Sequence, residues 1–193
     1  MVITRAELES FRGQTLPDLL GADVRLLFVG INPGLRAAAV KAPFGGGSNR
    51  FYPALYRAGI TREQISASNG FRPEDLAELH ARGIGITSLV ARASARADEL
   101  TNAELIEGAA LLAERVRMIA PCAVAMLGIT AYRTAFGRPK ALIGVQPETL
   151  GGAPLWVVPN PSGLNAHAPL PVLAAAYREV AVAAGIAVYE VPV

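Results

Sequence analysis

Two short loops hold the residues of this chain that could do chemistry together. The first reads Gly-Ile-Asn-Pro-Gly over residues 30–34, and the second reads Asn-Pro-Ser-Gly-Leu over residues 160–164. Each loop follows an apolar run that is typical of a buried strand. Because the carboxyl ends of parallel strands meet at one edge of a sheet, two such loops can share one crevice. The pattern predicts an enzyme whose site is built from both loops.

Three other kinds of site can be weighed against this interpretation. A nucleotide-binding module would use residues 30–34 as a phosphate-binding turn, but the G-x-G-x-x-G fingerprint and a helix start of the right spacing are not seen there. A serine hydrolase would need a G-x-S-x-G elbow, whereas Ser162 follows a proline in a loop. Cys122 begins the apolar run 122–127, so we expect it to pack as a small hydrophobe rather than act as a nucleophile.

The elements that must position the two loops alternate along the chain. Apolar runs predict strands at residues 24–29, 84–89, 123–127, 155–158 and 186–191. Helical spacing and capping residues predict helices at 4–12, 49–58, 73–81, 130–136 and 170–184, one that starts at Thr61, and a long one that Thr101 and Glu104 cap. A turn-rich region extends to Pro154. Strands separated by helices indicate an α/β fold with a central parallel sheet covered on both faces.

Length and composition limit the class of protein. The chain has 193 residues, 52% of them hydrophobic, so we expect one domain over residues 1–193 with a core that needs no disulfide or metal. One cysteine argues against a disulfide-stapled secreted protein. Apolar stretches end well before the roughly 20 residues of a membrane span, and no apolar leader is seen. We expect a cytoplasmic monomer with no membrane partner, whose net charge of +2 permits nucleic-acid binding without requiring it.

Four pieces of the sequence carry a resemblance to a known family. They are Gly-Ile-Asn-Pro-Gly at 30–34, Pro43-Phe44 followed by Asn49-Arg50-Phe51, Gly-Ile-Thr at 85–87, and Val-Pro-Asn-Pro-Ser-Gly-Leu at 158–164. In this order, they resemble the mismatch-specific uracil/thymine DNA glycosylase family of the uracil-DNA glycosylase superfamily. The resemblance implies a three-layer α/β/α fold, a base flipped out of double-stranded DNA, and hydrolysis of the bond between that base and deoxyribose. It implies no cofactor and no metal.

The resemblance also assigns roles to the first loop and its surroundings. Asn32 is expected to hold the attacking water; a neutral amide is a weak base, so its role is positioning, which suits a sugar that develops positive charge. Phe44 is expected to stack on the flipped base, and the glycines after it suit a backbone that lies close to a ligand. The small side chain of Ala37 sets the space for a thymine methyl group. The remaining expected pocket residues are Gly30, Ile31, Pro33, Gly34 and Asn160.

The second loop is expected to contact DNA more than the base. Gly163 and Leu164 match the family's wedge, which fills the hole that the flipped base leaves in the stack. The wedge arginine that family members often carry is replaced here by Asn165, with His167 close behind. We expect Ser162, Gly163, Leu164, Asn165 and His167 to lie at the DNA, together with the cations Arg36, Lys41 and Arg50 near the first loop and Arg92 and Arg96 farther along.

Two departures from the family bear on the chemistry. Ser88 stands where related chains commonly have lysine, and Asp98 stands where they tend to have asparagine. Asp98 could activate water or stabilise a cationic sugar, or it could only favour the dipole of the helix that Thr101 caps. Neither Lys41 nor Lys140 lies in a matching catalytic motif, so strand cleavage is not expected.

The sequence thus predicts a monofunctional glycosylase that excises uracil best from G:U mismatches and leaves an abasic site. Thymine is expected to be slower, if it is excised at all, and modified cytosine is a further candidate substrate. The alternative is a noncatalytic nucleic-acid-binding module on the same fold. The two readings differ in whether the protein makes abasic sites.

Overall fold

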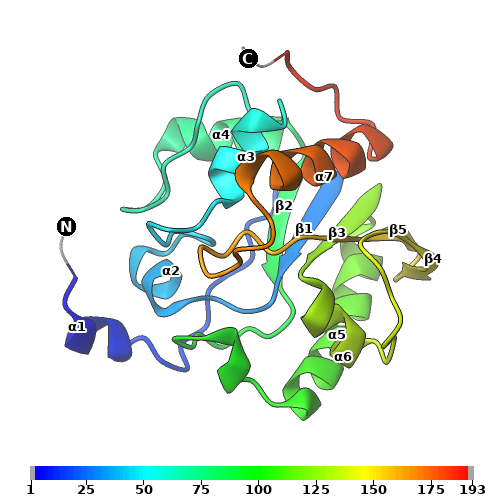
Figure 1. Ribbon diagram of the computed structural model, residues 1–193. Coiled ribbons are helices and arrows are strands. Elements are labelled where there is room, and N and C mark those ends of the chain that lie inside the picture. Colours follow the sequence, from blue (N-terminus) through cyan, green and yellow to red (C-terminus); the bar gives the residue numbers. More distant parts are fainter. Residues whose placement is uncertain (1–2, 191–193) are drawn as a thin grey trace.

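A five-stranded sheet forms the middle of the molecule in the computed structural model, which describes residues 3–190 (Figure 1). The strand order is β2-β1-β3-β5-β4. Four strands run parallel, and β4 pairs antiparallel with β5 at the edge. The strands are β1 (Leu26–Gly30), β2 (Ile84–Ser88), β3 (Ala123–Leu127), β4 (Gly144–Leu150) and β5 (Ala153–Val158). The sequence-based prediction of the four parallel strands is confirmed.

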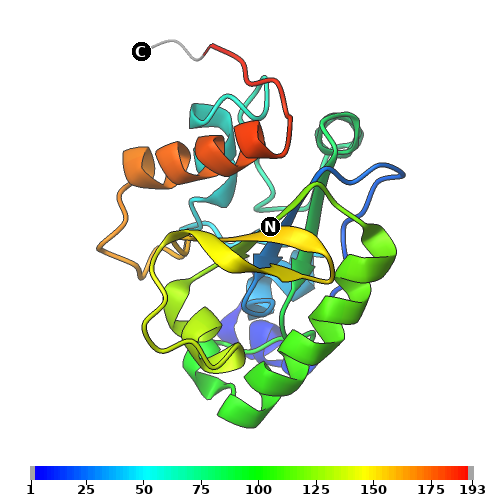
Figure 2. The same cartoon turned by 90° about the vertical axis from the view of Figure 1, so that its right-hand side faces the viewer.

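Helices cover both faces of the sheet, as Figure 2 shows from the side. Strand β1 explains the layering, because all its residues are buried and they alternate between two cores. Leu26 and Phe28 pack into the core under α3, α4 and α7, whereas Leu27 and Val29 pack into the core under α5 and α6. The covering helices are α3 (Phe51–Arg57), α4 (Pro73–Ala81), α5 (Asn102–Ile119), α6 (Ile129–Ala135) and α7 (Leu170–Ala183). The three-layer α/β/α fold is therefore observed.

The shorter helices lie toward the edge where the parallel strands end. They are α1 (Arg5–Glu9), α2 (Leu35–Val40) and the 3-10 helix η1 (Ala97–Glu99). Helix α2 was not predicted, and it starts directly after Gly34, which caps it. From the sequence we inferred only that a helix start of the spacing of a phosphate-binding turn was lacking, and we named no helix at these residues. Alanine favours a helix after the Pro33-Gly34 turn, and Leu35 and Ala38 pack against Ala93.

Other expectations about local structure are also corrected. No helix starts at Thr61; residues 61–63 form bends, and the side chain of Glu78 accepts a hydrogen bond from the backbone nitrogen of Arg62. No strand forms over residues 186–190, and Val191 lies outside the described residues. The region expected to be only turns contains β4, where Pro147 is tolerated because the strand is at the sheet edge and its register shifts there. Cys122 is exposed because it precedes β3 at the surface.

The capping boxes were predicted correctly. The backbone nitrogen of Glu104 donates to the Thr101 hydroxyl, and the Glu104 carboxylate accepts from the backbone nitrogen of Thr101, which starts α5. Thr4 and Glu7 do the same for α1. Within residues 3–190 no helix has the length and apolar character that crossing a membrane requires. In the same part of the chain, no cluster of three or more His, Cys, Asp and Glu side chains is placed to bind a metal ion.

Candidate active site

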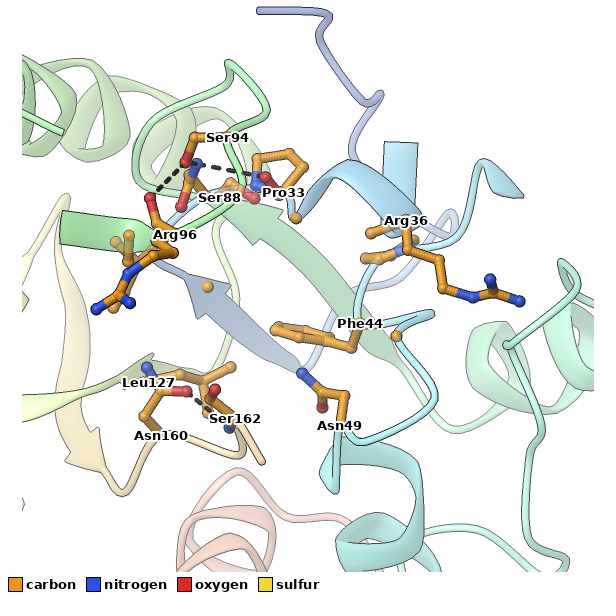
Figure 3. A pocket seen from close by; sticks show the side chains of 18 of the residues that line it. Pro33, Arg36, Phe44, Asn49, Ser88, Ser94, Arg96, Leu127, Asn160 and Ser162 are labelled. Atoms are coloured by element: carbon orange, nitrogen blue, oxygen red, sulfur yellow. Dashed lines mark hydrogen bonds between the residues drawn. The ribbon is translucent and has the colours of Figure 1, made fainter. Parts of the chain in front are cut away.

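A cavity of about 360 Å³ opens where β1, β2 and β5 end (Figure 3). It lies between loops that are far apart in the sequence, as the topology predicts. Asn32 and Phe44 both line it. So do Asp98 and the other residues expected at the pocket, namely Gly30, Ile31, Pro33, Gly34, Ala37 and Asn160. The structure therefore brings the predicted pocket residues to one place.

The side-chain amide of Asn32 is held in one orientation. Its nitrogen donates to the backbone oxygen of Arg92 at 3.0 Å and to Ser94 Oγ at 2.8 Å. A carbonyl oxygen can only accept, so the NH₂ group must face Arg92, and Oδ1 occupies the other position. Among residues 3–190 no protein group donates to this Oδ1. Asn32 therefore offers an oxygen that can accept a hydrogen bond from a water molecule.

Ser94 is the residue that joins the loop after β2 to the loop after β1. The residue is 1% exposed, and its Oγ accepts a hydrogen bond from Asn32 and donates one to the backbone oxygen of Arg96 at 2.7 Å. Its backbone nitrogen donates to the oxygen of Pro33 at 3.1 Å. Figure 3 shows Ser94, Pro33 and Arg96 together on one side of the cavity. The loop after β2 thus fixes the position of Asn32.

Phe44 forms part of the opposite side of the cavity. Its ring stacks on Phe51 with a centroid distance of 4.2 Å and an interplanar angle of 30°. A Cβ on Gly30 would lie 3.1 Å from Phe44 Cζ, so glycine at the end of β1 lets the ring lie this close. Phe44 has a φ of 57°, which is a left-handed backbone conformation that costs about 1–3 kcal/mol for a residue other than glycine. Such strain at a cavity wall is typical of a functional position.

Two asparagines place polar groups near the Phe44 ring. Asn49 Oδ1 accepts from the backbone nitrogen of Phe51 at 2.9 Å and so starts α3. This bond leaves the Asn49 amide nitrogen turned toward Phe44 in Figure 3. Asn160 Oδ1 accepts from the backbone nitrogen of Ser162 at 2.9 Å, which closes a turn at the end of β5. Asn49 belongs to the matched sequence pieces, but its role in the pocket was not predicted.

Further lining residues were also missed. Ser88 lies at the end of β2, and Arg115 of α5 donates to its backbone oxygen at 2.8 Å. A cation therefore lies behind Ser88, although the side chain at this position is neutral. No sequence signal connects Arg115 with this strand end. The other unpredicted lining residues are Leu16, Pro43, Gly46, Ser94, Ala95, Ala97 and Leu127.

Residues 161–168, which include all of the second loop except Asn160, form a segment that we call the wedge loop. Leu164 is 84% exposed at its tip and borders the cavity. The amide of Asn165 is used inside the loop: its nitrogen donates to the oxygen of Asn160 at 3.0 Å, and its Oδ1 accepts from the backbone nitrogen of His167 at 3.3 Å. His167 is exposed. The loop therefore presents an apolar tip, and Asn165 shapes it from within.

The end of β5 that carries the wedge loop is anchored to the core. The buried hydroxyl of Tyr177 on α7 donates to the oxygen of Pro159 at 3.2 Å. Burial raises the pKa of this hydroxyl well above its usual value, so it remains a donor. Ser162 lines the cavity, whereas Gly163 is exposed and packs against Ser48.

The expected DNA-contacting cations have different surroundings. Lys41 is exposed, and Arg36 lines the cavity while donating to the oxygen of Ser68 at 3.0 Å. Arg92 pairs with Glu104, and this hydrogen bond lowers the pKa of the Glu104 carboxyl to about 2. Arg50 is bound to backbone oxygens of the wedge loop. Arg36 and Lys41 are thus placed to meet a phosphate more readily than Arg50 or Arg92.

Asp98 lies at the cavity rim on η1. Its carboxylate is 63% exposed and accepts from Arg96 Nε at 3.0 Å and from Arg96 Nη2 at 2.6 Å. The hydrogen bonds from Arg96 lower the pKa of Asp98. A lower pKa keeps the group ionised and makes it a weaker base. The arrangement suits stabilisation of positive charge better than removal of a proton.

Comparison with known proteins identifies the family of the chain and a solved structure of similar fold. A family model described as the uracil DNA glycosylase superfamily matches residues 17–182. Among solved structures, an NMR structure of a protein from Methanosarcina acetivorans, described as a candidate uracil DNA glycosylase, is similar in fold with a TM-score of 0.58. The two chains are 17% identical, and the match covers 88% of this chain and 98% of the other.

Proposed function

The chain belongs to the uracil DNA glycosylase superfamily, and on that premise we propose that it removes uracil from G:U mismatches in double-stranded DNA. The N-glycosidic bond is hydrolysed, and an abasic site is left. The observation that carries the proposal is that Asn32 and Phe44 line one cavity at the carboxyl edge of the sheet. Its volume of about 360 Å³ lies at the lower end of the range for small-ligand sites.

In the proposed mechanism the uracil leaves the base stack and enters the cavity. Flipping costs a few kcal/mol, and the cost is lower for a mismatched base, which favours G:U over a normal pair. The base stacks on the Phe44 ring, whose other face is supported by Phe51. Leu164 enters the space that the base has left.

Hydrolysis then needs a positioned water molecule and a group that stabilises the negative charge of the departing base. Asn32 Oδ1 holds the water near C1′ of the sugar. The bond between C1′ and the base nitrogen breaks, its electron pair leaves with the base, and the water oxygen bonds to C1′ and releases a proton. A weak base suffices because the sugar has become strongly electrophilic by then. The Asn49 amide nitrogen is a donor for the departing anion.

Ser94 sets the orientation of Asn32, so its hydroxyl should matter for the rate. Ser94→Ala removes the nearest of the three acceptors that hold the Asn32 nitrogen, and leaves the backbone oxygens of Pro33 and Arg92. We expect the single-turnover rate of uracil excision to fall about tenfold with DNA affinity unchanged, because the water is held less well. Ser66→Ala, at an exposed serine outside the cavity, is the control. If Ser94→Ala excises uracil at the wild-type rate, the hydrogen bond from Asn32 to the Ser94 hydroxyl is not needed to orient Asn32.

Asp98 is proposed to stabilise the positively charged sugar through its fixed negative charge. Asp98→Asn should reduce the single-turnover rate by about three- to tenfold, since the carboxylate is exposed and shared with Arg96. Because hydrogen bonds from Arg96 lower the pKa of Asp98 below the usual range of an aspartate, the carboxylate stays ionised, and we expect it to cause no change in the wild-type rate between about pH 5 and about pH 8.

The control for Asp98 is Glu107→Gln, which removes the same charge from an exposed position on α5. If the wild-type excision rate falls as the pH is lowered from neutral, and this fall disappears in Asp98→Asn, the electrostatic role is contradicted and Asp98 acts as a general base. An unchanged rate in Asp98→Asn at every pH removes Asp98 from the mechanism.

The function itself is tested with duplexes that contain one U:G, U:A, T:G or C:G pair. Abasic sites are revealed by strand cleavage in mild alkali. We expect U:G to be the best substrate and T:G to be slower, with the small buried side chain of Ala37 leaving room for the methyl group. Thymine excision as fast as uracil excision contradicts this order. Binding without abasic sites supports the noncatalytic module, and breakage before alkali contradicts a monofunctional enzyme.

A further inference from the structure

Arg50 is surrounded by backbone oxygens of the wedge loop. Its Nη1 donates to the oxygen of Ala168 at 2.7 Å, and its Nη2 donates to the oxygens of Ser162 and Asn165, each at 2.7 Å. Its backbone nitrogen donates to the oxygen of Pro161 at 3.0 Å. One residue therefore binds the loop at both ends and in the middle, through charge-assisted hydrogen bonds that are stronger than neutral ones.

The same residue belongs to the side of the cavity that carries the stacking ring. Arg50 directly precedes Phe51, the first residue of α3, and Phe51 stacks on Phe44. A second contact joins the two segments without Arg50: a Cβ on Gly163 would lie 2.7 Å from the backbone oxygen of Ser48. The segment with Phe44 and the wedge loop are thus packed backbone to backbone.

We propose that Arg50 is a positioning residue that holds the wedge loop in the shape that presents Leu164 to DNA. This inference rests on the proposed function. A loop that is already ordered does not lose conformational freedom when DNA binds, so more of the binding energy is available to open the base pair. Arg50 acts through the loop and does not itself touch the uracil.

The surroundings of Arg50 separate this role from that of a phosphate contact. A phosphate-binding arginine offers its guanidinium to solvent, whereas this one is occupied by three carbonyl oxygens. Its Nε is buried and has no hydrogen-bond partner among the described residues. Opening the loop would leave the three carbonyl oxygens without this donor, so the loop and the guanidinium order each other.

The test compares paired and unpaired uracil in single-turnover excision. Arg50→Met is expected to excise uracil about tenfold more slowly than wild type on a U:G duplex. When the uracil lies in a bubble of unpaired bases, we expect the variant to be less than about threefold slower, because flipping an unpaired base costs little free energy. Leu164→Ala should show the same dependence on substrate, and the double variant should be no slower than the slower single one. Arg50→Lys should recover part of the loss. Arg57→Met, on the exposed face of α3, should match wild type on both substrates.

Hydrogen exchange gives a readout that does not depend on activity. The backbone amides of Leu164, Asn165 and His167 are bonded within the wedge loop and should exchange faster in Arg50→Met, whereas amides of β1 and β3 should not change. Unchanged exchange in the loop overturns the proposal, and so does an equal loss of activity on both substrates. If amides of β1 and β3 also exchange faster in Arg50→Met, both the excision rates and the hydrogen exchange are measured with Arg50→Lys instead. If the wild type makes no abasic sites, the proposed function fails and exchange still decides the role of Arg50.

Discussion

Asn32→Ala is expected to lower the single-turnover rate of uracil excision by about 10²- to 10³-fold, while affinity for the mismatched duplex stays near that of wild type. Alanine removes the oxygen that holds the water and leaves the stacking ring and the wedge loop in place. The rate is measured with enzyme in excess over a U:G duplex, and affinity is measured under conditions in which excision is slow.

Two further variants make this result specific. Asn32→Asp is not expected to restore the rate, because a carboxylate has no hydrogens to donate to the backbone oxygen of Arg92 and would be repelled by it. Asn69→Ala, at an exposed asparagine outside the cavity, is the control for surface changes and should leave the rate unchanged. A rate for Asn32→Ala within about tenfold of wild type would show that water is held by another group.

Phe44→Ala has the second largest expected effect. Stacking of a base on an aromatic ring is worth about 1–3 kcal/mol, so kcat/KM for the U:G duplex should fall by about 5- to 150-fold. Phe44→Leu keeps an apolar side chain against Phe51 but has no aromatic face, so it should recover the folding stability more than the activity. Thermal unfolding measured beside the kinetics separates the two effects. Full activity in Phe44→Leu would indicate that the ring only fills space.

The sheet could be predicted from the sequence because its strands are apolar runs that end in turn residues. Strand β1 is buried along its whole length, and its apolar run ends at Gly30. Strand β4 could not be found this way, because an edge strand has one side exposed and this one contains Pro147. Helix α2 owes its form to packing against Ala93 rather than to periodicity. Cys122 was expected to be packed because it begins an apolar run, but it precedes the strand that the rest of the run forms, and it is exposed.

The residues that line the cavity could be predicted from the sequence better than the residues that hold them in place. Asn32, Phe44 and Asn160 follow strand ends or turns that are visible in the sequence, and they line one cavity. Ser94 and Arg50 act through hydrogen bonds to partners about sixty or more positions away, and no local pattern records such partners. Arg50 was expected at the DNA because it is a cation near a loop, but its charge is directed at carbonyl oxygens of the protein.

In the proposed complex, the Asn32 amide and the Phe44 ring receive a base that has left the duplex. A crystal structure with a U:G duplex tests it most directly when the deoxyuridine carries a 2′-fluorine, which destabilises positive charge on the sugar and slows cleavage. We expect uracil to be stacked on Phe44, with Asn32 Oδ1 facing C1′ and Leu164 in the space that the base has left. A uracil that stays paired in the duplex, or that binds away from this cavity, would contradict it.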